Sequence, residues 1–147
     1  MAMPTGWDPS KDPLMQTIGF VRMVEVDRDA GRVVVEFEAK QNQCHSGNIV
    51  QGGFVTGWID NAMATAAMAK VDFQKVSISL DVHVSFFRAA NPGIVVAEGW
   101  VEHAGGRTVF AEGHLRTPEG EIIAKATSTL ALMTPRRRSQ ASRRRTS

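Results

Sequence analysis

The sequence has only one cysteine, Cys44, so no disulfide can form within the chain, and this usage fits a reducing cytoplasm. The first residues, MAMPTGWDPSKDP, lack the apolar core of a signal peptide. The most apolar segment of the chain is too short and too interrupted for a membrane span. These absences predict a cytoplasmic protein that is neither anchored in a membrane nor crosses one.

Charge is also scarce in the middle of the chain. Between Lys40 and Lys70 only Asp60 carries a formal charge, and it lies within a run of Ala, Met, Val, Ile, Phe and Trp. A carboxylate among apolar side chains is costly unless it is paired, hydrogen-bonded, protonated or used in chemistry. Asp60 is therefore a candidate functional residue.

The segment Gly53–Ala69 contains no proline and is rich in alanine and methionine, which predicts a helix of four to five turns. Gln51 and Gly52 come directly before it, so two glycines begin the helix. Their bare backbone N–H groups, supported by the helix dipole, suit an oxygen that gains negative charge. Asp60 follows about two turns into the same helix.

Six segments alternate apolar and polar residues as half-buried strands do. Two precede the helix and form a hairpin, and four follow it: residues 18–27, 32–40, 75–89, 94–104, 107–117 and 121–133. The long segment 75–89 is expected to be a central strand. Its alternation predicts one buried apolar face (Val76, Ile78, Leu80, Val82 and Val84), and it leaves Ser77 and Ser79 pointing outward.

An antiparallel sheet with one buried helix is an α+β domain in which the sheet must curl round the helix. Exposed strand edges then favour pairing with a second copy of the chain. We expect this domain to cover residues 1–133, with a loose lead-in over residues 1–13 and a short helical turn near Leu14–Thr17.

The last segment, residues 134–147, holds six arginines, and without them the chain has 11 basic and 15 acidic residues. Its composition predicts a disordered Arg-rich tail on a mildly acidic domain. The tail is the only hint of nucleic acid binding. We expect no such partner, because the domain offers neither a groove-reading helix nor an aromatic platform.

The stretch VQGGFVTGWIDNAMATAAM, with this order of elements, resembles the hotdog-fold acyl-CoA thioesterases of the phenylacetate-pathway (PaaI-like) type. That family has an Asn, then six residues later a His or Gln, then two glycines, and an acidic residue nine positions after the His. Gln51, Gly52, Gly53 and Asp60 fall on the later positions. The likeness covers about residues 13–133, including VSFFRAANPG, HAGGRT and TPEGEIIAKATS.

The resemblance implies hydrolysis of an acyl-CoA thioester in a site shared by two subunits of a homodimer or a dimer of dimers. The Gly52 N–H would hold the thioester oxygen, and Gln51 would orient the carbonyl. Asp60 of the partner subunit would activate water or, alternatively, attack directly. Coenzyme A is part of the substrate, and the reaction needs no metal and no separate cofactor.

His45 stands where the family usually has Asn, so it is a further catalytic candidate that offers the imidazole Gln51 lacks. The resemblance also implies that the substrate is bound by residues of the helix start and the later strands: Gly53, Ser79, Phe86, Arg88, Gly106 and Arg107. Aromatic or medium-chain acyl groups are plausible, but the sequence does not select one.

Two other functions fit the same fold. A non-catalytic acyl-CoA sensor would use the cleft without needing a buried base, and a hotdog dehydratase would carry a His-Phe-Pro stretch that this sequence lacks. Cys44 and His45 resemble a nucleophile and its base only in their adjacency. The remaining histidines, His83, His103 and His114, do not have the spacing of metal ligands.

Overall fold

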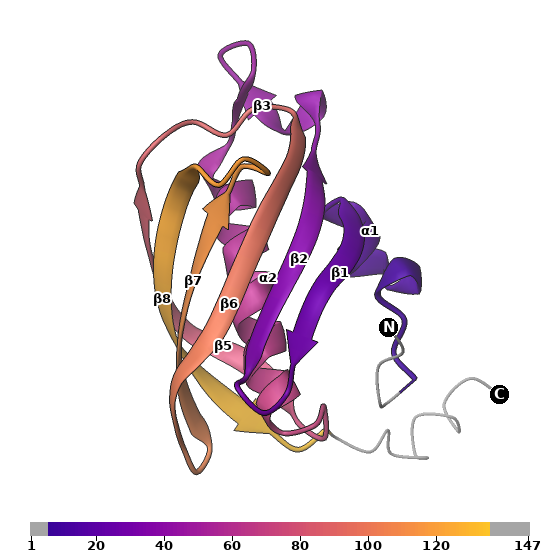
Figure 1. Cartoon of the computed structure of the whole chain (residues 1–147), viewed down its shortest axis with the longest axis vertical. Coiled ribbons are helices and arrows are strands. Elements are labelled where there is room, and N and C mark those ends of the chain that lie inside the picture. Colours follow the sequence, from indigo (N-terminus) through magenta and orange to yellow (C-terminus); the bar gives the residue numbers. More distant parts are fainter. Residues whose placement is uncertain (1–5, 136–147) are drawn as a thin grey trace, which may run out of the picture.

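One long helix, α2 (Gly52–Lys70), lies along the inner face of a curved antiparallel sheet (Figure 1). The computed structural model describes residues 6–135. The six strands run in the order β1-β2-β6-β7-β8-β5 across the sheet. Their bounds are β1 Phe20–Asp27, β2 Arg32–Ala39, β5 Val76–Phe86, β6 Gly93–Gly105, β7 Thr108–Arg116 and β8 Ile122–Met133. This is the α+β hotdog architecture that the sequence predicted.

The described residues include little of the predicted tail. Of the predicted Arg-rich tail, only Thr134 and Pro135 fall within the described residues, so the prediction for the tail is untested. Within residues 6–135 no helix is long and apolar enough to cross a membrane.

The segment before β1 contains more structure than predicted. The sequence predicted a loose lead-in over residues 1–13, but Pro9–Lys11 forms a 3-10 helix. The helical turn predicted near Leu14–Thr17 is confirmed as α1, which covers Pro13–Thr17. Asp12 caps α1 by accepting hydrogen bonds from the backbone N–H groups of Leu14 and Met15. Its other oxygen accepts from Trp7 Nε1 at 2.9 Å. One carboxylate therefore ties Trp7 to the start of α1.

Two glycines of the sheet allow α2 to pack closely against it. A Cβ atom added to Gly99 in β6 would lie 2.4 Å from the carbonyl carbon of Ala62, and one added to Gly113 in β7 would lie 2.9 Å from Ile59. Any larger residue would push the helix away. The helix side chains that face the sheet, including Trp58, Ile59 and Met63, are fully buried.

The structure corrects two predictions for β5. The strand lies at the edge of the sheet beside β8 and is not central. Its register with β8 shifts between Ser79 and Asp81, so Leu80 is an extra residue. Because of this bulge, Ser77, Ser79, Val82 and Val84 face α2, whereas Val76, Ile78 and Leu80 are exposed on the outer face. The predicted single apolar face and the outward serines are therefore wrong.

Two short strands that the sequence did not predict precede α2. These are β3 (Cys44–His45) and β4 (Ile49–Val50), which pair with each other as a separate two-stranded sheet. The Val50 N–H also donates to the carbonyl of Ala90 at 2.9 Å. These bonds connect the chain at the helix start to the segment between β5 and β6.

The outer face of the sheet carries a cluster of charged side chains around Glu98. Its carboxylate, only 12% exposed, accepts from Arg32 Nη2 at 3.0 Å and from Arg116 Nε at 3.2 Å. His114 Nε2 lies 3.2 Å from the same carboxylate, and the Trp100 ring packs edge-on against the imidazole. The cluster joins β2, β6 and β7 and lies on the sheet face opposite α2.

We predict that His114 makes the protein less stable in mild acid. Burial lowers the pKa of His114 below its usual 6.5, and Arg116 and Lys125 act in the same direction, whereas Glu98 opposes them. Below pH 6.5 the unfolded chain therefore binds a proton that the folded protein resists. The free energy of unfolding, measured in urea, should fall between pH 7.5 and pH 5.5, and His114→Gln should make this fall smaller. An unchanged pH dependence in the variant would contradict the assignment.

Candidate active site

Asp60 lies on the one side of α2 that the sheet leaves uncovered. Its side chain is half-buried, and Oδ1 accepts a hydrogen bond from Ser79 Oγ at 2.6 Å. Ser79 reaches this position because the extra residue Leu80 reverses the alternation of β5, so that the serines before it face the helix. The uncovered side is made mostly of small residues, which leave space beside the carboxylate: Gly53, Thr56, Gly57, Asp60 and Ala64.

The start of α2 leaves one backbone amide free. Gln51 is the N-cap residue, and its side-chain Oε1 accepts from the Gly53 N–H at 2.8 Å. The Phe54 N–H donates to the Gln51 carbonyl at 3.0 Å. Among the hydrogen bonds of residues 6–135, none uses the Gly52 N–H. Gly52 is therefore the first-turn amide that can bind an acceptor from outside.

Several predicted site residues meet in a cavity of about 390 Å³ beside this amide. His45, Gly52, Phe86 and Arg88 all contribute to its lining. The Phe86 ring lies against Gly52, since an added Cβ there would be 3.3 Å from Cζ of the ring. Arg88 forms an ion pair with Glu121 at 2.7 Å, and both side chains are at least half exposed. The structure thus groups these four residues at the start of α2.

His45 and Cys44 do not form a nucleophile–base pair. His45 is exposed, and its Nδ1 lies 3.0 Å from Ser46 Oγ. The Cys44 thiol instead donates to the carbonyl of Lys40 at 3.5 Å.

Asp60 and Gly52 of the same chain lie too far apart to act on one carbonyl. Eight residues separate them in α2, which corresponds to about 12 Å along the helix axis. A thioester carbonyl held by the amide would need its attacking water within hydrogen-bond reach of the acid. A single chain therefore keeps these two candidate groups apart, and we call each of them a half-site.

Gly106 and Arg107 are not near Gly52 within one chain. They lie in the turn between β6 and β7, where Gly106 has a φ of +58°. Figure 1 shows this turn at the opposite end of the molecule from β3, which precedes the start of α2. The substrate-binding residues predicted from the sequence are therefore divided between the two ends of the domain.

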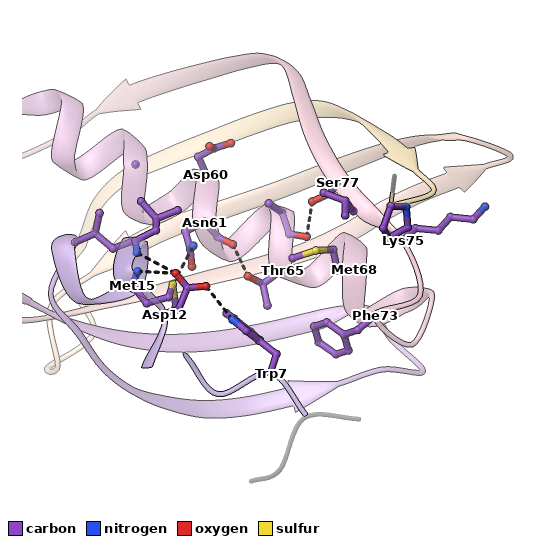
Figure 2. Close-up of a pocket in the computed structure, with 16 residues that line it drawn as sticks. Trp7, Asp12, Met15, Asp60, Asn61, Thr65, Met68, Phe73, Lys75 and Ser77 are labelled. Atoms are coloured by element: carbon purple, nitrogen blue, oxygen red, sulfur yellow. Dashed lines mark hydrogen bonds between the residues drawn. The ribbon is translucent and has the colours of Figure 1, made fainter. Parts of the chain in front are cut away.

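A second and larger cavity, of about 510 Å³, runs along α2 from Asp60 (Figure 2). The sequence analysis missed most of its lining. Trp7 lies in the segment expected to be loose, and neither Met15 nor Phe73 belongs to a recognisable motif. The hydrogen bond from Trp7 to Asp12 and the packing of Trp7 against the hydrophobic core place this residue at the cavity, and both depend on the folded chain.

Comparisons with known proteins agree with this architecture. A family model described as the thioesterase superfamily matches residues 47–124, which is 78 of the 147 residues. The matched region contains α2, both half-sites and the bulged strand β5.

Individual relatives are more distant. A Saccharolobus solfataricus protein, SSO2140, provisionally named an esterase, is 24% identical over 76% of this chain and 79% of its own. A solved structure from Ralstonia eutropha JMP134, a phenylacetic acid degradation-related protein provisionally named a thioesterase, is 26% identical. It matches with a TM-score of 0.75 over 82% of this chain and 90% of its own.

The Escherichia coli PaaI protein from the phenylacetic acid degradation operon shares the fold. Its TM-score is 0.75 at 17% identity, over 84% of this chain and 86% of its own. The chain therefore belongs to the thioesterase superfamily, and it is a thioester hydrolase with a hotdog fold that is similar to that of PaaI.

Proposed function

We propose that this thioester hydrolase cleaves acyl-CoA in a site formed by two chains. Asp60 of one chain would act on a thioester whose oxygen is held by the partner's Gly52 N–H. The observation that carries this proposal is the separation of about 12 Å between the free amide and the acid along one helix. Each half-site lacks the group that the other supplies.

Two unpartnered surfaces support the dimer. The edge of β5 has backbone groups with no neighbouring strand among the described residues, and the uncovered side of α2 lies next to it. If two β5 strands pair about a twofold axis, the two α2 helices meet in opposite directions. If the axis also crosses α2 between Gly52 and Asp60, each Asp60 approaches the partner's Gly52.

The proposed reaction uses only water and the groups of these half-sites. Ser79 holds Oδ1 of Asp60, so Oδ2 is left to take a proton from water as the water oxygen attacks the carbonyl carbon. The Gly52 N–H and the helix dipole stabilise the resulting oxyanion. When the C–S bond breaks, the proton passes from Asp60 to the sulfur, giving the free acid and coenzyme A. No metal or separate cofactor takes part.

Gln51 and His45 would assist at the carbonyl. Because the Gly53 N–H occupies Gln51 Oε1, the side-chain amide is fixed, and its Nε2 is available to donate to the thioester oxygen. His45 lines the same cavity, and its imidazole would assist the reaction at the edge of that cavity. The role of Gly53 would be to hold the Gln51 side chain in place through this hydrogen bond.

The coenzyme A part of the substrate would lie against the cationic residues. Arg88 lines the cavity beside Gly52. Its guanidinium would bind a phosphate of coenzyme A when that phosphate replaces the Glu121 carboxylate as its ion-pair partner. Gly106 and Arg107 lie at the end of the domain opposite the start of α2. In the antiparallel dimer they would therefore approach the half-site of the partner that contains its Gly52 amide.

We predict that Asp60→Asn removes most activity. Without a base, kcat/KM for acyl-CoA should fall by about 10²- to 10⁴-fold, measured as release of the CoA thiol. Asp72→Asn, an exposed carboxylate on the loop after α2, is the matched control and should retain wild-type rates. Binding of acyl-CoA without thiol release by the wild type would instead indicate a sensor, and loss of water from a 3-hydroxyacyl-CoA would indicate a dehydratase.

We also predict that Gly52→Pro inactivates the enzyme without unfolding it. Proline suits the first position of a helix, and the Gln51 ψ of 136° is compatible with a following proline. The substitution therefore removes mainly one N–H, and kcat should fall by about 10²- to 10³-fold. Gly52→Ala, which keeps the N–H but meets the same Phe86 ring, is the control.

Mixing the two inactive variants tests whether the site is shared. A heterodimer of Asp60→Asn and Gly52→Pro chains has one intact site, so random exchange should restore about one quarter of wild-type activity. A site contained within one chain would recover none. Circular dichroism of each variant would show whether inactivity reflects chemistry or loss of fold.

A further inference from the structure

The cavity along α2 is mainly apolar. It begins beside Asp60, passes Ala64 and Met68, and ends against Phe73. The opposite wall is the N-terminal segment, with Trp7, Leu14, Met15 and Ile18. Figure 2 shows Trp7 and Phe73 on the same side of the cavity, while the Lys75 side chain extends away from both.

The acidic groups of this lining are already engaged. Both oxygens of Asp12 accept hydrogen bonds, one from Trp7 Nε1 and the other from backbone N–H groups at the start of α1. Asp60 is bonded to Ser79. Lys75 is the basic residue of the same lining. A positively charged group entering between Trp7 and Phe73 would therefore lose its water without finding a free carboxylate, which is costly.

The cavity would stay accessible in the proposed dimer. If each Asp60 meets the partner's Gly52, the twofold axis crosses α2 midway between these positions, near Thr56. The two helices then overlap only from Gly52 to Asp60. Ala64 and Met68 lie beyond the first residue of the partner helix, so the cavity starts at the thioester and continues for about 12 Å past Asp60.

We infer that this cavity holds the acyl group, and that it selects apolar acyl groups that carry no positive charge and are long enough to pass Ala64. The inference rests on the proposed function. Ala64 lines the passage with a short side chain, so a larger residue at this position would narrow it. Trp7 and Phe73 limit the length. The N-terminal segment, held by the Trp7–Asp12 hydrogen bond, is thus a specificity-determining wall.

The test compares acetyl-, hexanoyl- and decanoyl-CoA across three variants. Ala64→Phe should block the passage and lower kcat/KM for decanoyl-CoA by about tenfold or more, while acetyl-CoA changes by no more than about twofold. Trp7→Ala should shift the preference towards longer chains. Trp100→Ala, which removes a tryptophan from the outer face of the sheet, is the control and should leave the profile unchanged.

A charged analogue tests the polarity of the cavity. A ten-carbon acyl-CoA with a terminal ammonium group should be hydrolysed at least about tenfold more slowly than decanoyl-CoA by the wild type. The inference is overturned if the wild type hydrolyses acyl-CoA but Ala64→Phe and Trp7→Ala both leave the chain-length profile as it was, or if the ammonium group makes no difference. Absence of CoA release from every substrate would instead overturn the proposed function.

Discussion

The close packing of α2 on the sheet is the interaction on which the rest of the molecule depends. Gly99 and Gly113 provide no side chain where the helix crosses, so the helix backbone can approach the strands directly. Trp58, Ile59 and Met63 of α2 are buried on that side, whereas the side around Asp60 carries mostly small residues. The free Gly52 amide and the Asp60 carboxylate both belong to this rigid helix. Their spacing is therefore fixed by helix geometry and cannot adapt to a substrate within one chain.

The bulge in β5 positions a serine beside the candidate acid, but it also exposes apolar side chains of the same strand. Ser79 can reach Asp60 only because the strand reverses its faces at Leu80. The same reversal exposes Val76, Ile78 and Leu80 on the outer face, where water solvates them poorly. A regular strand would have buried these three side chains and pointed the serine outward. The hydrogen bond to the acid and the exposed apolar residues are thus two results of one backbone irregularity.

Local sequence patterns predicted the positions of the long helix and of the six strands. The helix was predicted at Gly53–Ala69 and found at Gly52–Lys70, and the strands agree to within about three residues at each end. The patterns failed where distant parts of the chain decide the outcome. A period of two cannot reveal an extra residue at Leu80, because the bulge is defined by pairing with β8. Trp7 was missed because its position depends on a hydrogen bond to Asp12, and the Glu98 cluster because its members come from three strands. The motif identified Asp60 and Gly52 as candidates, and the predicted helix already placed them about two turns apart. The coordinates added the hydrogen bond from Ser79 to Asp60, which the strand pattern had excluded.

Gly57 gives an independent physical argument for a second chain at the uncovered side of α2. A glycine inside a helix costs about 1 kcal/mol relative to alanine. Gly99 and Gly113 offset this kind of cost by allowing close contact, but a Cβ added to Gly57 would meet no atom within 4 Å in the described chain. No packing within the described chain therefore requires the missing side chain at this position, which borders the cavity beside Asp60. Gly57 lies between Gly52 and Asp60, in the part of α2 that would cross the partner helix. A glycine there allows two backbones to approach closely enough for the acid of one chain to reach a thioester held by the amide of the other.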